Sequence, residues 1–265
     1  LKSNNWKQAA RSILTTDTKP KLLSRMIKNG SEGIAVTGFA KGSGMIRPDF
    51  ATLLSFVFID AKINRSLLDN IHSEALSESF NRITVDGDTS PNDSSVLVAS
   101  GRTKSHIKRG TAIERKIRSA VIEIYKELAD ALIKDAEGAT KKITIKVVQA
   151  KTEKQAESVA FTVAESPLVK TAMFGNDANW GRILSAIGRS PEVNDVSKTS
   201  IHLNGVPLAK NGNLHPQHSE SKASKEITKK NLEVTIKLGL GKSTFSVITS
   251  DFSEDYLLIN SDYRS

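Results

Sequence analysis

Residues 41–54 read KGSGMIRPDFATLL, and this stretch says more about fold and chemistry than any other part of the chain. Two glycines and a proline interrupt the backbone before an apolar run that extends from Phe50 to Ile59. We expect that run to form a buried strand. Thr52 stands near its start. β-Branched residues are common in strands for conformational reasons, so residue type alone does not make Thr52 catalytic.

The spacing of apolar residues on either side of this strand predicts both helices and further strands. A 3.6-residue period predicts a helix over 63–79, capped by Asp60, and a long helix over 111–134. Shorter helices are expected over 6–14, over 158–174 with a break near Pro167, and over 180–187. Apolar or alternating runs predict strands over 34–37, 83–85, 95–100, 143–148, 200–203, 232–238, 244–249 and 256–259.

The order of these elements indicates the fold class. Residues 209–224 are rich in Asn, His, Ser and Lys, and we expect them to form a loop. Strands and helices follow one another without a regular βαβ rhythm. We therefore predict an α+β fold in which helices pack on largely antiparallel sheets.

Composition excludes several classes of protein. The chain of 265 residues has no cysteine, which excludes a disulfide scaffold and a thiol nucleophile. It has no apolar run long enough to span a membrane and no secretory leader, so we expect a cytoplasmic protein, or a mitochondrial matrix protein in a eukaryote. The net charge is +9, but the densest basic run, 222–230, lacks aromatic residues. Acidic small-molecule substrates explain this charge as well as nucleic acid does, and a basic binding module stays a less favoured alternative.

Three short patterns resemble known sites but lack an essential part. The pair His215 and His218 lies in a polar stretch that is typical of a solvated loop rather than a metal site. Residues 239–243 end like a phosphate-binding loop, but Ile236 occupies the position of a required glycine. Residues 86–90 read DGDTS, like the nucleophile loop of an aspartate phosphatase, but such enzymes need a doubly wound parallel sheet. No metal or cofactor site is expected.

An ordered series of motifs resembles the ornithine acetyltransferase (glutamate N-acetyltransferase) family. Residues 41–54 match the self-cleavage site of that family, in which Ala-Thr-Met-Leu appears here as ATLL over 51–54. The other matching motifs are 15–21 (TTDTKPK), 80–90 (FNRITVDGDTS) with Asn92 and Asp93, 137–141 (EGATK), 174–183 (FGNDANWGRI) and 259–265 (INSDYRS). Asp49, Phe50, Leu53 and Ser265 depart mildly from the family pattern. A series in this order rejects the phosphatase interpretation of 86–90.

The resemblance implies a self-processing threonine nucleophile. The Thr52 hydroxyl would attack the carbonyl of Ala51, and hydrolysis of the ester would free the α-amino group of Thr52. An α-amine has a pKa of roughly 8 and can serve as a local base. Thr52 would then take an acetyl group from N2-acetyl-L-ornithine and pass it to L-glutamate, a step of arginine biosynthesis. Acetyl-CoA as a second acetyl donor is left open by these motifs.

The resemblance also places substrate-binding residues in this sequence. They are Thr15, Lys41, Thr52, Glu137, Asn260 and Ser265. Lys41 would pair with a substrate carboxylate, and Glu137 would face the amino end of ornithine. Asn260 and Ser265 would close the site from the far end of the chain. For Thr15 the register is open, because Thr16 is its neighbour.

The resemblance further implies an αββα-like sandwich and an assembly of cleaved pieces. Residues 1–51 would end the α piece, residues 52–265 would form the β piece, and two of each would build a heterotetramer. The family carries an upstream Thr-Gly oxyanion pair, worth about 3 kcal/mol in comparable enzymes, which this sequence lacks. We therefore expect a C-terminal fragment with bare apolar edges that is inactive alone.

A self-processing aminopeptidase is the alternative enzyme class. It would use the same Thr52 hydroxyl but release an amino-terminal residue to water. The stretches 137–141 and 179–182 favour the transferase.

Overall fold

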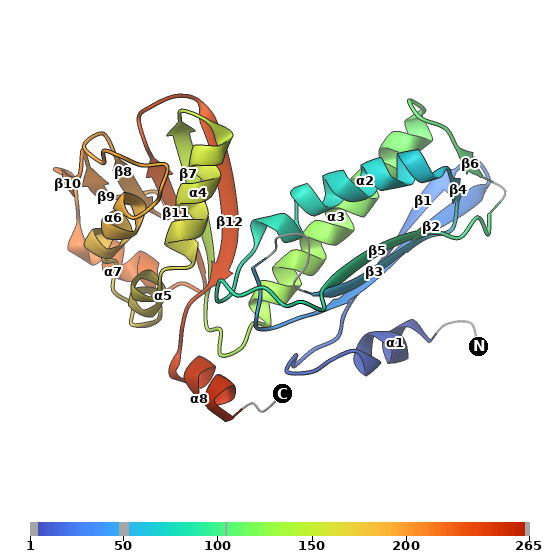
Figure 1. Ribbon diagram of the computed structural model, residues 1–265, viewed down its shortest axis with the longest axis horizontal. Helices are drawn as coiled ribbons and strands as arrows, with labels where there is room; N and C mark the ends of the chain where they lie inside the picture. The colour runs from blue at the N-terminus through green and yellow to red at the C-terminus, as the bar shows by residue number, and fades with distance from the viewer. Residues whose placement is uncertain (1–4, 48–52, 104, 263–265) are drawn as a thin grey trace. The chain divides into compact units, whose positions relative to one another are not determined.

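The computed structural model describes residues 5–47, 53–103 and 105–262 of the chain, which divides into two units (Figure 1). Unit 1 is Leu1–Ala136 and unit 2 is Glu137–Ser265. Each unit builds its own sheet and covers it with helices, so the predicted α+β class is confirmed. No helix in the described part of the chain is both long and apolar enough to cross a membrane.

Unit 1 contains a four-stranded sheet in the order β1-β2-β3-β5. Its strands are β1 (Lys21–Asn29), β2 (Glu32–Lys41), β3 (Leu54–Ile59) and β5 (Ser94–Ala99). The β1–β2 and β2–β3 pairs are antiparallel, and β5 runs parallel to β3. A short parallel pair, β4 (Lys62–Ile63) with β6 (His106–Ile107), and the 3-10 helix η1 (Phe80–Arg82) complete the unit.

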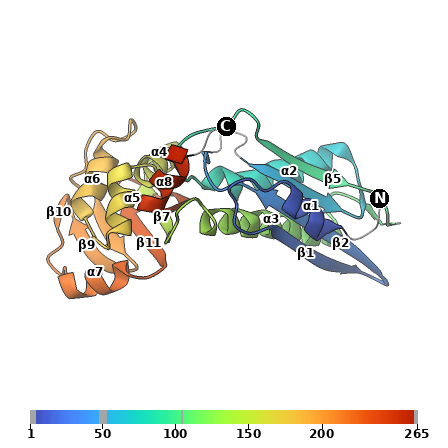
Figure 2. The ribbon, with the colours of Figure 1, turned by 90° about the horizontal axis from the view of Figure 1, so that it is seen from below.

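The helices of unit 1 lie on both faces of this sheet. Helices α2 (Arg65–Ser77) and α3 (Ala112–Lys134) cover one face, and α1 (Trp6–Ser12) lies on the other (Figure 1; Figure 2). Gly38 of β2 faces α3 closely, because a Cβ there would stand 2.9 Å from a methyl group of Ile124. On the opposite face Trp6 packs on Phe58, with ring centroids 5.2 Å apart.

Unit 2 contains a six-stranded sheet in the order β10-β9-β8-β11-β7-β12. Its strands are β7 (Lys142–Ala150), β8 (Ser200–Leu203), β9 (Val206–Lys210), β10 (Asn213–Leu214), β11 (Asn231–Lys237) and β12 (Ser243–Ser250). All neighbouring strands are antiparallel except β11 and β7, which are parallel. The prediction of largely antiparallel sheets is therefore confirmed.

The helices of unit 2 are α4 (Glu153–Ala164), α5 (Pro167–Phe174), α6 (Trp180–Gly188), α7 (Glu220–Ile227) and α8 (Glu254–Asp262). Helix α4 packs on the central strand β7 and its neighbour β12, and α6 packs on α4. The apolar side chains Ile143, Ile145 and Val147 of β7 are almost fully buried in this core. The predicted helix over 158–174 is two helices, and the second begins at Pro167, where the break was expected.

Several predicted elements are wrong. The run 256–259 lies in helix α8 rather than a strand, and none of the residues of α8 is buried. Asn64, not Asp60, caps α2, because its side chain accepts a hydrogen bond from the Leu67 amide. Residues 83–85 form no strand beyond a single bridge at Ile83, and 209–224 include β10 and the first turn of α7.

Candidate functional site

Thr15 and Lys41, predicted from motifs 26 residues apart, lie together in unit 1. Lys41 is the last residue of β2, and its Nζ donates a hydrogen bond to Thr15 Oγ1 at 3.4 Å. Thr15 is exposed and Lys41 is half-buried, so both are open to a small molecule. Thr16 points elsewhere, with its hydroxyl 2.6 Å from that of Ser43. The geometry thus associates Thr15, rather than Thr16, with Lys41.

Asp17 fixes this pair from beneath. Its side chain is fully buried, and Oδ1 accepts hydrogen bonds from the Gly42 amide at 2.8 Å and from Lys21 Nζ at 2.5 Å. Lys21 Nζ also lies 2.5 Å from Asp135 Oδ2. Burial alone would raise the pKa of Asp135, but hydrogen bonds from Lys21 and Thr18 and the charge of Lys21 hold it below its ordinary value. A buried cation between two carboxylates therefore joins motif 15–21 to the glycine segment after β2.

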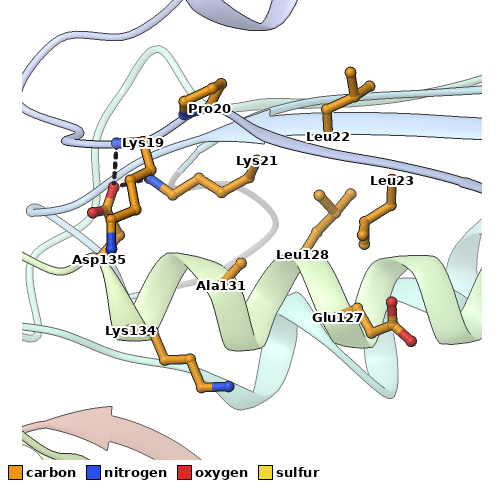
Figure 3. Close-up of a pocket in the computed structure, with 10 residues that line it drawn as sticks. All are labelled: Lys19, Pro20, Lys21, Leu22, Leu23, Glu127, Leu128, Ala131, Lys134 and Asp135. Atoms are coloured by element: carbon orange, nitrogen blue, oxygen red, sulfur yellow. Dashed lines mark hydrogen bonds and ion pairs between the residues drawn. The ribbon is translucent and has the colours of Figure 1, made fainter. Parts of the chain in front are cut away.

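A groove of about 330 Å³ lies beside this network, between the start of β1 and the last turns of α3 (Figure 3). Leu23 and Leu128 lie on facing sides of it, and the Lys21–Asp135 ion pair closes one end. Neither Thr15 nor Lys41 lines the groove. We therefore assign it to packing at the sheet edge and not to the candidate substrate site.

The 86–93 loop binds the main chain on both sides of the predicted cleavage site. Asp86 accepts hydrogen bonds from the amides of Met45 at 2.7 Å and Ile46 at 3.0 Å. Met45 has φ 51°, a conformation unfavourable for L-residues, and these bonds help to hold it. On the far side of the cleavage site the Ser94 amide donates to the Leu53 carbonyl at 2.9 Å. Ala51 and Thr52 themselves lie outside the described residues.

Asp93 ends this loop, directly before β5. Burial of its carboxyl raises its pKa to about 6, while hydrogen bonds from Ser90 and the charge of Lys41 act in the opposite direction. Its Oδ2 is buried without a hydrogen-bond partner. Sequence reasoning missed this residue as a site candidate, although it belongs to a motif that carries the family resemblance.

Glu137 and Asn260 lie together in unit 2, although 123 positions separate them. The Asn260 side-chain amide donates to Glu137 Oε2 at 2.9 Å. Glu137 is half-buried and Asn260 is exposed, so this pair is also accessible. Gly138 permits the close approach, because it has φ 63° and a Cβ there would stand 2.4 Å from the Tyr256 amide nitrogen. Ser253 Oγ donates to the Gly138 carbonyl at 2.6 Å.

Asp251 and Lys141 support this pair from the interior. The buried Asp251 carboxylate accepts from the amides of Thr140 and Lys141, each at 2.9 Å. Lys141 Nζ donates to the Met173 carbonyl and to Asn176 Oδ1, which links the 137–141 and 174–183 motifs. Burial lowers the pKa of Lys141, and the charge of Asp251 acts in the opposite direction.

The structure thus pairs Thr15 with Lys41 and Glu137 with Asn260. Ser265, like Ala51 and Thr52, lies outside the described residues. Within 5–47, 53–103 and 105–262, no three His, Asp or Glu side chains gather in a way that could hold a metal ion. Asp17, Asp86 and Asp93 were not predicted as site residues. The only available signal was their place inside matching motifs, since aspartates beside glycines and turns are common.

Comparison with protein families decides which group of proteins has this arrangement. The sequence model of the ArgJ family matches residues 1–265. The chain belongs to the ArgJ family. This confirms the resemblance drawn from the ordered motifs.

Named ArgJ proteins are similar over the whole chain. The arginine biosynthesis bifunctional protein ArgJ of Pseudomonas fluorescens (strain Pf0-1) is 41% identical over 269 residues, which take in 100% of this chain and 66% of that protein. The protein of the same name from Methylococcus capsulatus is 43% identical, with 100% and 65% coverage. The chain therefore spans just under two thirds of the length of these curated relatives.

A solved structure supports the fold. A crystal structure of the arginine biosynthesis bifunctional protein ArgJ from Bacillus halodurans matches with a TM-score of 0.71 at 34% identity. The match covers 77% of this chain and 96% of that chain. At this identity the likeness supports both the α+β architecture and membership of the ArgJ family.

Proposed function

We propose that this chain is part of an N-acyltransferase of arginine biosynthesis that moves an acetyl group from N2-acetyl-L-ornithine to L-glutamate. The observation that carries the proposal is membership of the ArgJ family over the full length of the chain, including the 41–54 motif. The relatives are named for arginine biosynthesis and as bifunctional. We extend the proposal accordingly to acetyl-CoA-dependent synthesis of N-acetylglutamate as a second activity.

In the proposed mechanism Thr52 is the nucleophile. Self-cleavage between Ala51 and Thr52 leaves the hydroxyl and the α-amine on one residue. The hydroxyl oxygen bonds to the acetyl carbon, the amide C–N bond of N-acetylornithine breaks, and the hydroxyl proton passes through the α-amine to the departing ornithine nitrogen. Attack by the amine of glutamate on the ester then regenerates Thr52. The proposal needs no metal or cofactor.

The proposed substrate contacts use the residue pairs of the described structure. Lys41 supplies a cation for the α-carboxylate of either substrate, with Thr15 beside it. The β2–β3 register supports this role, since Lys41 stands opposite Leu54, two residues from Thr52. Glu137 supplies a carboxylate for the side-chain ammonium of ornithine, and Asn260 orients it. Ser265 would complete the site.

The proposal includes the cleaved pieces and their assembly. We propose the pieces 1–51 and 52–265, and a heterotetramer of two α and two β pieces in the cytoplasm or mitochondrial matrix. The solved relative gives support, because 77% of this chain accounts for 96% of that chain. Such a ratio is expected where that chain corresponds to the part after the cleavage site.

The test uses the product of the complete gene, as wild type and as Thr52→Ala and Thr52→Ser variants. We expect intact mass to show two pieces for wild type and one uncut chain for Thr52→Ala. Labelled acetyl should pass from N-acetylornithine to glutamate through a Thr52 ester that can be trapped. Thr52→Ser keeps the hydroxyl and should retain partial activity. Transfer that persists in Thr52→Ala would contradict the mechanism.

Two further assays separate the alternatives. Hydrolysis of aminoacyl-nitroanilides without acetyl transfer would favour the aminopeptidase. Retention on heparin with a steep salt dependence, together with an uncut Ala51–Thr52 bond, would favour the basic binding module. Lys41→Ala should raise the KM for both substrates by roughly tenfold or more, the size of losing one charge-assisted hydrogen bond. Lys28→Ala, which removes an exposed lysine of β1, is the matched control.

A further inference from the structure

Asp93 lies next to the proposed nucleophile by the register of three strands. Lys41 of β2 stands opposite Leu54 of β3, and Leu54 stands opposite Ser94 of β5. The Ser94 amide is bonded to the carbonyl of Leu53, the residue joined directly to Thr52. Asp93 immediately precedes Ser94. Its side chain therefore leaves the backbone at the row of the sheet that holds Lys41 and the residues after Thr52.

The carboxylate of Asp93 has unused hydrogen-bonding capacity. Ser90, in its own loop, supplies hydrogen bonds, while Oδ2 is buried without a partner. An unpaired buried polar atom costs about 1–3 kcal/mol, so native proteins rarely keep one without a use. Lys41 from β2 is the charged side chain of the described residues that acts on Asp93. Its cation favours the ionised carboxylate without occupying Oδ2.

We propose that Asp93 is a positioning residue whose carboxylate accepts a hydrogen bond from the α-amino group that cleavage exposes on Thr52. This inference rests on the proposed function and adds the partner that orients its base. The amine takes the proton from the Thr52 hydroxyl as the oxygen–acetyl bond forms, and gives it to ornithine as the C–N bond breaks. Asp93 stays ionised throughout and holds the amine beside the hydroxyl.

The chemistry of the amine supports this assignment. A neutral amine has two N–H donors and one lone pair, so a donor directed to Asp93 leaves the lone pair for the hydroxyl proton. A nearby carboxylate also stabilises the ammonium form, which raises the pKa of the amine. Removing the negative charge should therefore lower that pKa and move the acidic limb of the pH–rate profile to lower pH. A purely structural loss would reduce the rate without moving the limb.

The experiment compares Asp93→Asn, Asp93→Glu and Asp88→Asn in the product of the complete gene. Asp88 is an exposed residue of the same loop, so Asp88→Asn is the matched control. Intact mass measures cleavage, and kcat and KM for acetyl transfer are measured from about pH 5 to 9. Melting temperature reports folding.

For Asp93→Asn we expect cleavage, a fall in kcat of roughly 10- to 100-fold, and KM changed by less than about twofold. The acidic limb should move to lower pH by at least about half a unit. Asp93→Glu should recover part of kcat and the original limb, and Asp88→Asn should match wild type.

Each other outcome is decisive. An Asp93→Asn protein with wild-type kcat and an unmoved limb overturns the inference. So does an Asp93→Asn protein that melts like wild type but is not cleaved, because the carboxylate then acts before the amine exists. A wild-type protein that is neither cleaved nor active contradicts the proposed function as well. Active wild type beside unaffected Asp93→Asn contradicts the role of Asp93 alone.

Discussion

Replacing Gly138 by alanine tests whether the pairing of Glu137 with Asn260 depends on one backbone position. Gly138 has φ 63°, and a Cβ there would meet the Tyr256 amide nitrogen at 2.4 Å and Ser253 Oγ at 2.6 Å. The left-handed conformation costs an L-residue roughly 1–2 kcal/mol. Displacing Ser253 also loses its hydrogen bond to the Gly138 carbonyl, worth about 1 kcal/mol.

We therefore expect Gly138→Ala to lower the free energy of unfolding by about 2–3 kcal/mol, or roughly 5–10 °C in melting temperature. Gly205→Ala is the matched control, since Gly205 has φ 84° but nothing within 4 Å of a new Cβ. It should cost only the conformational part, roughly 1–2 kcal/mol.

The functional readout is the KM for N-acetylornithine in the product of the complete gene. The start of α8 must shift to admit the new methyl group, which moves Asn260 away from Glu137. We expect the KM to rise roughly tenfold, equivalent to about 1.4 kcal/mol of binding, and to stay unchanged in Gly205→Ala. Equal stabilities for the two variants, with equal KM values, would refute the reasoning.

Two further predictions concern buried charge. Lys21→Met should lower the free energy of unfolding by about 3–5 kcal/mol, because Asp17 and Asp135 stay buried without their cation, while Lys19→Met, at an exposed position, should change it by less than about 0.5 kcal/mol in the same denaturant titration. His202 has its pKa lowered from 6.5, first by burial and then by the charges of Lys237 and His215. The unfolded chain therefore binds more protons than the folded one as pH falls through 6.5, so stability should decrease there. This decrease should be smaller in His202→Gln and unchanged in His106→Gln.

Local sequence signals predicted the elements whose burial repeats over many residues. Helix α3 was predicted almost to the residue, because its apolar stripe continues for 23 residues and Thr111 caps it. Helix α8 was mistaken for a strand, because a short apolar run has no period that separates the two states. Leu257 and Leu258 are more than half exposed, so no core fixes their pattern.

Strand β1 was missed for a related reason. It forms one edge of its sheet, and its side chains alternate poorly between buried and exposed. Met26, in the middle of the strand, is 67% exposed. An edge strand of this kind is held by pairing with β2 over its whole length, and strand pairing between distant residues leaves little trace in local composition.

The candidate site was predictable only in part, for a physical reason that concerns the aspartates. No periodicity could show that Asn260 meets Glu137 or that Lys41 meets Thr15, so the family resemblance supplied those residues. The aspartates of the motifs have a different task, which the structure makes visible. Asp17 binds the Gly42 amide, Asp86 binds the amides of Met45 and Ile46, and Asp251 binds those of Thr140 and Lys141.

A carboxylate that accepts backbone amides holds a segment in place without a regular element, which glycine-rich chain beside a reactive residue needs. Asp93 departs from this pattern, because its Oδ2 has no partner. The other three aspartates are satisfied by the fold itself. Asp93 keeps an acceptor for a group that the uncleaved backbone does not offer, and a free α-amine on Thr52 is such a group.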